Sequence, residues 1–222
     1  MKYITTALKT SRVEGLSDGI FAIAMTILVL SFEVVLQHPV VMGEKQFINS
    51  LINLLPDFLH YVESFILLGV FWFLHHQQFH YIKVTDAVLV FINIVGLMLI
   101  GLVPFTTVLV SDYGHLRPAS VLFEINLFLA GIVFFGHWHY ATKNNRLVEK
   151  SLDASIIKYY KMRNLLIPAV SFIAMLISFF NSGAGILFFF IVPIILIIFR
   201  RKAIGFNYPA NDQQSISDAH PQ

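Results

Sequence analysis

The chain of 222 residues is 57% hydrophobic and only 13% charged, which excludes an ordinary soluble domain and predicts an integral membrane protein. Cysteine is absent, so a disulfide framework, thiolate metal sites and cysteine catalysis are excluded. The net charge of +2 carries little information until the distribution of lysine and arginine is considered.

The first predicted membrane helix, residues 12–36, is apolar over most of its length but polar in its first two turns. Those turns contain Arg12, Glu14, Ser17 and Asp18. Ionisable residues inside a membrane helix are costly, so they usually pair with partners and serve a function. No small-residue cleavage site follows the apolar run, so we expect this helix to be retained rather than removed as a signal peptide.

Five more apolar stretches follow, and each approaches the roughly 20 residues that a membrane-spanning helix needs. They cover residues 57–80, 86–110, 119–141, 162–181 and 184–200. The chain is therefore predicted to be an all-α integral membrane protein with six transmembrane helices in one domain, residues 1–204, followed by a polar, disordered cytoplasmic tail, residues 205–222. Residues 142–160 form the one long polar connection, for which we expect a short amphipathic helix built on Leu147, Leu152 and two isoleucines.

The basic residues predict the orientation of these helices. An even number of spans puts both termini on the same side, and with the termini inside, all 15 lysines and arginines except Lys45 and Arg117 face the cytoplasm. Cytoplasmic loops of membrane proteins carry the excess of positive charge. Both termini are therefore predicted to be cytoplasmic.

An aliphatic stripe follows the polar turns of the first helix. At about 100° per residue, Ile23, Ile27, Leu30 and Val34 fall within a stripe about 60° wide. Asp18 lies roughly opposite, so it would point back into the protein if the stripe lined an axis. Such a stripe on a membrane helix is ordinarily packing or lipid contact, so spacing alone does not make it the wall of a pore.

The pattern Arg-x-x-x-Leu-Ser-Asp-Gly-x-Phe-Ala-Ile, which begins at Arg12, resembles the first helix of the prokaryotic relatives of the lysosomal potassium channel, the transmembrane protein 175 family. The family signature has Phe where this chain has Leu16, which is a conservative difference. The signature occurs once, and the resemblance continues through all six predicted helices. It implies a single six-helix unit that assembles as a homotetramer, with the first helices around a central pore.

The resemblance further implies a potassium-preferring cation channel in a lipid bilayer, the plasma membrane if the source is prokaryotic, with K⁺ as the permeant ion and no cofactor. The positions matching Ile23, Ile27 and Leu30 form the narrow hydrophobic part of the pore in that family, and such a ring gates by dewetting. The position matching Thr26 favours potassium over sodium there. No Thr-Val-Gly-Tyr-Gly filter occurs in this chain, so we expect weaker selectivity than in filter-bearing channels. Glu33 follows the neck, where it either concentrates cations or lies among lipid headgroups.

A polar group is predicted behind this helix, on the cytoplasmic side. The second helix ends with Trp72, His75 and His76, and Asp86 opens the third. The resemblance implies that these residues help tie the first three helices together. A buried Asp18 without a partner would be costly, so we expect a donor from His75 or His76, without deciding which. The predicted structural network consists of Arg12, Ser17, Asp18, His75, His76 and Asp86.

The residues leave two other functions to consider. Five histidines on the cytoplasmic side suggest a membrane di-iron enzyme, but such enzymes need more histidines, and His137 and His139 lie on nearly opposite helix faces. An ion- or proton-coupled transporter is the stronger alternative, because Glu63 and Glu124 lie midway along two helices, although no inverted repeat is visible. No phosphate loop, nucleophile elbow or nucleic-acid motif occurs, so no enzyme, metal site or nucleic-acid partner is expected.

Overall fold

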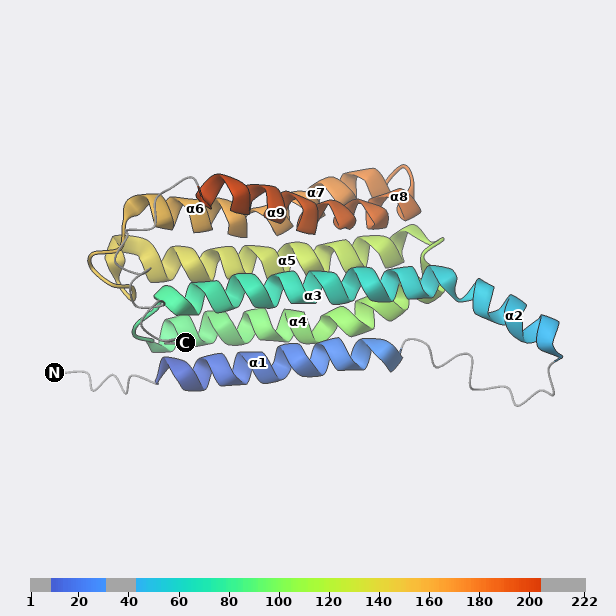
Figure 1. The fold of residues 1–222 in the computed structure, drawn as a ribbon, viewed down its shortest axis with the longest axis horizontal. Helices are drawn as coiled ribbons and strands as arrows, with labels where there is room; N and C mark the ends of the chain where they lie inside the picture. Colours follow the sequence, from blue (N-terminus) through green and yellow to red (C-terminus); the bar gives the residue numbers. More distant parts are fainter. Residues whose placement is uncertain (1–8, 31–42, 205–222) are drawn as a thin grey trace, which may run out of the picture.

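The computed structural model describes residues 9–30 and 43–204, which fold into an elongated bundle of helices (Figure 1). The first part of the chain forms α1 (Thr10–Ile27), α2 (Glu44–Asn53), α3 (Leu55–Tyr81), α4 (Ala87–Tyr113) and α5 (Arg117–Thr142). The second part forms η2 (Lys143–Asn145), α6 (Ala154–Asn164), α7 (Leu166–Ser178), α8 (Ser182–Leu187), η3 (Phe188–Phe190) and α9 (Ile191–Ile204). In the described residues, the one strand-like pairing is an isolated bridge between Ile82 and Val148.

Successive long helices run in alternating directions, so the bundle has two ends (Figure 1). We call the end where α1 begins, α3 ends and α4 begins the proximal end, and the opposite end the distal end. Within the described residues, five helices are long and apolar enough to cross a membrane: Thr10–Leu30, Leu55–Tyr81, Ala87–Tyr113, Arg117–Asn145 and Ala154–Ser178. The prediction of an all-α, multi-pass membrane protein is confirmed.

The second, third and fourth predicted spans are confirmed to within three residues at each end. The first predicted span continues to residue 36, but Glu33 and Val34 lie outside the described residues. The sixth, residues 184–200, is divided among α8, η3 and α9, none of which is long enough to span a membrane. Pro193 explains the break, because its ring would clash with the carbonyl of Phe189 in a continuous helix but is tolerated in the first turn of α9.

The fifth span begins at Ala154 rather than at residue 162. The helix expected within residues 142–160 therefore forms only over its second part, with Ile156 and Ile157, whereas Leu147 and Leu152 lie outside any helix. The Asp153 carboxylate caps α6 by accepting a hydrogen bond from the Ser155 N–H at 2.7 Å, which also lowers the pKa of this carboxyl group. α6 then continues into α7 with a break only at Leu165. The lysines and tyrosines of α6 conceal its continuity with the apolar helix in the sequence.

The loop before α6 is packed against the bundle. Asn144 and Asn145 adopt positive φ angles of 56° and 49°, which asparagine tolerates better than most residues, and they turn the chain back. The Lys83 N–H donates to the Leu147 carbonyl at 2.9 Å, beside the Ile82–Val148 bridge. These contacts close a small hydrophobic cluster, which we call the proximal clasp: Ile82, Leu89, Ala141, Leu147 and Val148.

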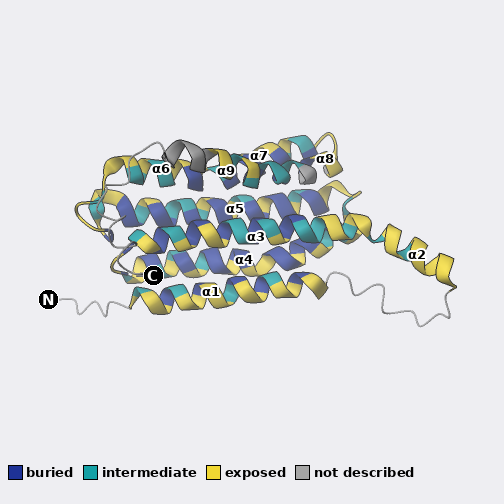
Figure 2. Cartoon of the chain, in the orientation of Figure 1, coloured by how far each residue is buried: buried dark blue, intermediate teal, exposed yellow. Residues whose placement is uncertain are grey.

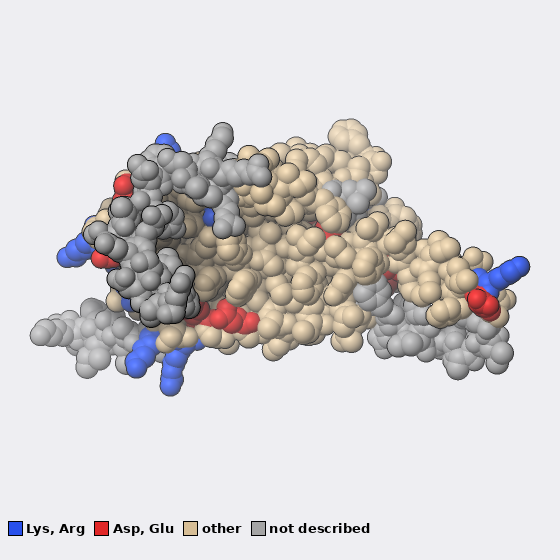
Figure 3. Space-filling view, in the orientation of Figure 1, with Lys and Arg blue, Asp and Glu red and all other residues tan. Residues whose placement is uncertain are grey.

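The main hydrophobic core joins α3, α4, α5 and α7 with one face of α1 and with residues of η3 and α9, while α2 and the rest of α1 are largely exposed (Figure 2). α5 and α7 approach closely, since a methyl group at Gly131 would lie 2.6 Å from Cδ of Pro168. Small residues at helix contacts allow such an approach in membrane proteins. Lysine and arginine side chains gather toward the two ends of the face in Figure 3, and the broad belt between them is largely uncharged, as a lipid-facing surface requires.

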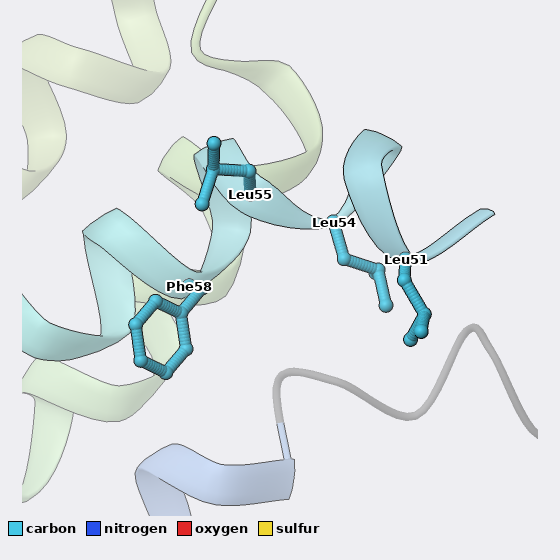
Figure 4. A pocket seen from close by; sticks show the side chains of 4 residues that line it. All are labelled: Leu51, Leu54, Leu55 and Phe58. Atoms are coloured by element: carbon cyan, nitrogen blue, oxygen red, sulfur yellow. The ribbon is translucent and has the colours of Figure 1, made fainter. Parts of the chain in front are cut away.

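An open apolar hollow lies at the junction of α2 and α3 (Figure 4). Leu51, Leu54, Leu55 and Phe58 line its volume of about 300 Å³. These side chains offer no group that binds an ion or transfers a proton. The hollow therefore has no chemistry for a catalytic or ion-binding site.

Candidate functional site: the first helix and its polar network

α1 has one face against the bundle and one face away from it. The buried face consists of Val13, Ser17, Phe21, Ala24 and Leu28. The predicted pore-lining residues lie outside this face: Ile23, Ile27 and Leu30 are 59%, 44% and 64% exposed. The described part of the protein therefore leaves the aliphatic stripe uncovered. This exposure is expected both for the wall of a pore and for a surface that faces lipid.

Thr26 lies on the same uncovered side of α1. Its hydroxyl group donates to the Ile23 carbonyl at 2.8 Å, so the lone pairs of the oxygen stay available to a cation or a donor. Gly15 and Gly19 also face open space, because a methyl group built on either meets nothing within 4 Å. The uncovered face of α1 thus combines an aliphatic stripe, small residues and one hydroxyl group.

The proximal half of α1 is anchored by a buried chain of hydrogen bonds. The Ser17 hydroxyl donates to the Val13 carbonyl at 2.9 Å and accepts from Nδ2 of Asn93 at 3.1 Å. The other end of that amide, Oδ1 of Asn93, lies 2.8 Å from Nε2 of His75. The Val13 carbonyl can only accept, so the Ser17 hydroxyl donates to it and accepts from the Asn93 amide nitrogen. The amide oxygen of Asn93 then faces His75, so Nε2 of His75 carries the hydrogen. The chain links α1 to α4 and α3 and selects one tautomer of His75.

A second side-chain amide orients a second buried histidine. Nε2 of Gln78 donates to the Phe134 carbonyl at 3.2 Å, so its Oε1 accepts from Nδ1 of His137 at 2.7 Å. The rings of His75 and His137 stack with their centroids 6.0 Å apart. Both rings are therefore held in fixed positions between α3 and α5.

Asp18 is bound by a tryptophan, so the expected histidine donor is wrong. The indole N–H of Trp72 donates to Oδ1 of Asp18 at 2.8 Å. His76 stacks on Trp72, with 5.6 Å between centroids, and its Nδ1 lies 3.2 Å from the Glu14 carboxylate. His75 points about 100° away around α3, into the bundle, and cannot serve the same side. α1 and α3 are thus joined by two exposed polar contacts beside the buried one.

Two members of the predicted network lie apart from it. The Asp86 carboxylate caps α4 by accepting from the Leu89 N–H at 2.8 Å, and it accepts from the Tyr140 hydroxyl on α5 at 2.8 Å. Arg12 is exposed at the proximal end and belongs to neither of the ion pairs found among the described residues. The network around α1 therefore contains Ser17, Asp18, His75 and His76, to which the structure adds Trp72, Asn93 and Glu14.

The histidines do not converge on a common point. His75 and His137 are buried, whereas His76, His80 and His139 are exposed. Across residues 9–30 and 43–204, no group of three or more histidine, cysteine, aspartate or glutamate side chains is placed to hold a metal ion. The geometry gives no support to a di-iron centre.

The sequence matches proteins of known function over most of its length. The family model of the endosomal/lysosomal potassium channel TMEM175 matches residues 12–104. A potassium channel of Chamaesiphon minutus is 33% identical over 193 residues, which cover 84% of this chain and 92% of the relative. A potassium channel of Streptomyces collinus is 30% identical over 159 residues, which cover 70% of this chain and 75% of the relative.

The fold also matches a solved structure. The crystal structure of a lysosomal potassium-selective channel TMEM175 homolog from Chamaesiphon minutus has a TM-score of 0.70 and 27% sequence identity to this chain. The match covers 88% of this chain and 98% of that one. With the signature at Arg12 and the high coverage of both relatives, the chain belongs to the family of the endosomal/lysosomal potassium channel TMEM175.

Proposed function

We propose that this protein is a potassium-preferring cation channel, and no enzyme, in which α1 of each subunit of a homotetramer lines a central pore. The observation that carries the proposal is the uncovered face of α1, because Ile23, Ile27 and Leu30 are exposed although the same helix is anchored firmly on its other side. Membership of a family of potassium channels supports the choice of ion.

The uncovered face suits a ring of helices. Small residues allow neighbouring membrane helices to approach closely, so Gly15 and Gly19 fit the contact between adjacent copies of α1. The aliphatic stripe then faces the axis, where Ile23, Ile27 and Leu30 form a hydrophobic constriction that closes by dewetting. This geometry needs no re-entrant filter loop.

Thr26 is the residue proposed to favour potassium. Its hydroxyl hydrogen is committed to the Ile23 carbonyl, so the oxygen presents lone pairs and no donor to a passing ion. Four such oxygens around an axis replace part of a hydration shell, which costs less to remove from potassium than from sodium. Selectivity by four hydroxyl groups is weaker than selectivity by rings of backbone carbonyls.

The membrane arrangement is part of the same proposal. The channel domain is proposed to comprise residues 1–204 with six crossings, of which α8, η3 and α9 supply the last. The proposed cytoplasmic tail, residues 205–222, lies outside the described residues. The excess of lysine and arginine at the proximal end supports cytoplasmic termini in a prokaryotic plasma membrane. The permeant ion and the lipid are the expected partners, and no cofactor is required.

Ion flux into liposomes that contain only this protein tests the proposal. A channel passes potassium down either gradient without a coupled substrate, whereas a transporter saturates and needs a counter-ion. Ile23→Asn and Ile27→Asn should raise flux and reduce the preference for potassium, because a polar ring wets the constriction. Ile173→Asn, at an exposed position of α7, is the matched control and should leave flux unchanged. Unchanged flux in both α1 variants at normal expression would remove these residues from the pore.

A further inference from the structure

A layer of buried polar side chains crosses the distal half of the bundle, away from the uncovered face of α1. We call it the distal polar layer. It consists of Glu63 and Ser64 on α3, Thr106 and Thr107 on α4, Glu124 and Asn126 on α5, and Ser178 on α7. Buried polar groups in lipid-embedded helices are costly and usually serve a function.

Hydrogen bonds connect the layer across four helices. The hydroxyl groups of Ser64 and Thr107 share a hydrogen bond at 2.8 Å. The amide nitrogen of Asn126 donates to the Thr106 hydroxyl at 3.4 Å. The Ser178 hydroxyl donates to Oε1 of Glu124. These three separate hydrogen bonds join α3 to α4, α4 to α5 and α5 to α7.

The layer contains more acceptors than donors. Oε1 of Glu63, Oε2 of Glu124 and Oδ1 of Asn126 are buried and have no hydrogen-bond partner. The two glutamates are 2% and 0% exposed, so bulk water does not reach them. An unsatisfied buried acceptor is unfavourable, and an unpaired buried carboxylate is more so.

Among the described residues, His60 is the one basic side chain paired with either carboxylate: its Nδ1 lies 3.8 Å from Oε2 of Glu63. Glu124 belongs to neither of the ion pairs found there. The α7 and α8 helices carry no titratable residue, and the Asp57 carboxylate accepts from the Ser111 hydroxyl. The remaining titratable residues on the distal parts of the helices packed here are Tyr61, Asp112, Tyr113 and Arg117.

We propose that Glu63 and Glu124 are proton-binding residues inside each protomer, separate from the conduction path, and that at least one of them is protonated at neutral pH. The bound proton turns one carboxylate into a carboxylic acid, whose O–H supplies a donor to the layer and leaves one negative charge instead of two. A proton also needs no cavity. The space beside Glu124 is filled, because a methyl group on Gly185 would lie 2.7 Å from its Oε1 and 1.9 Å from Oγ of Ser178.

Proton binding at this site is coupled to the packing of the α7–α8 turn. Ser178 ends α7 and Gly185 lies within α8, and both are in contact with the Glu124 carboxyl group. Loss of the proton restores two charges in a region of low dielectric and weakens this packing. The folded protein thus holds a proton that the unfolded chain releases above a glutamate pKa of about 4.3. Stability should fall as pH rises.

Infrared difference spectroscopy of the full chain in lipid nanodiscs tests the site directly. The native protein at neutral pH should show the carbonyl band of a protonated carboxyl group in apolar surroundings. The band should be lost in the Glu63→Gln, Glu124→Gln double variant, which keeps the shape of the protonated side chains. Glu44→Gln, at an exposed position of α2, is the control and should retain the band. No band in the native protein, or an unchanged band in the double variant, overturns the proposal.

Unfolding as a function of pH provides a second measurement that is independent of ion flux. One linked proton changes the unfolding constant by up to about tenfold per pH unit, and the double variant should show a flatter profile than the native chain. Equal profiles would contradict the proposal. Stabilisation of the native chain by potassium or sodium chloride at constant ionic strength, lost in the double variant, would assign the site to a metal ion instead and would equally overturn it.

Discussion

Replacement of Asn93 by leucine should loosen the buried anchor between α1 and the rest of the bundle. Leucine is similar in size, but it can neither donate to Ser17 nor accept from His75. His75 would keep a buried N–H without an acceptor, at about 1–3 kcal/mol, and the lost bond to Ser17 adds about 0.5–1.5 kcal/mol. The free energy of unfolding should therefore fall by about 1.5–4.5 kcal/mol.

Reversible unfolding in mixed micelles of a mild detergent and dodecyl sulfate, followed by tryptophan fluorescence, measures this change. Asn49→Leu is the matched control, because Asn49 lies exposed on α2, and it should leave the unfolding free energy unchanged. The His75→Leu variant provides a double-mutant cycle with Asn93→Leu. Removal of the ring also removes the unpaired N–H. The loss of unfolding free energy in the double variant should therefore be smaller than the sum of the losses in the two single variants, by about 1 kcal/mol or more.

The reasoning fails if the network contributes no more than an average membrane hydrogen bond. Such bonds between transmembrane helices contribute about 0.6 kcal/mol on average. A loss of less than about 0.5 kcal/mol in Asn93→Leu, together with strictly additive behaviour in the cycle, would show that α1 is held by apolar packing alone.

Three further substitutions have defined outcomes. Thr26→Val should lower the potassium-to-sodium permeability ratio measured by bi-ionic reversal potentials, while the pore still conducts, because it removes the exposed hydroxyl oxygen. Asp18→Ala should reduce the yield of assembled tetramer in native mass spectrometry without changing single-channel conductance, because an indole N–H loses its acceptor. Gly131→Ala should lower the unfolding free energy by about 1–3 kcal/mol, because the added methyl group would lie 2.6 Å from Cδ of Pro168.

For each of these substitutions, one result would contradict the expected outcome. An unchanged permeability ratio in Thr26→Val would leave that residue a purely structural role. Normal tetramer yield with altered conductance in Asp18→Ala would put this carboxylate in the ion path. For Gly131→Ala the control is Gly136→Ala on the same helix, where a methyl group meets nothing within 4 Å, and equal stability of the two variants would refute the close approach.

The long apolar helices could be predicted from the sequence because burial in lipid requires continuous apolar runs. Leu55–Tyr81 and Ala87–Tyr113 are such runs, so composition alone locates them. A helix was expected near Ile156, but its continuity with the fifth span was missed. The polar residues of α6 lie at the end of that span, where a helix leaves the apolar part of the bilayer and tolerates lysine and tyrosine. Pro193 divides the last apolar stretch, an effect that a count of apolar residues does not detect.

The partners of the polar residues were harder to predict than the residues themselves. A donor to Asp18 was expected, but Trp72 was overlooked as a donor because an indole ring in a membrane helix suggests apolar packing. Asn93 was missed although a lone amide in an apolar helix is itself a signal. Pairing depends on the rotation and depth of each helix, and those follow from packing of the whole bundle.

The proximal clasp affects how the longest polar connection can be cut or modified. A protease can cleave at Leu147 or Val148 only after these residues leave the bundle, because both side chains are buried there. The rate of cleavage would then report how often the segment opens. A reporter domain inserted in the same place would pull both side chains out of contact with Leu89 in the first turn of α4. A loop that looks free in the sequence is thus a poor site for insertion.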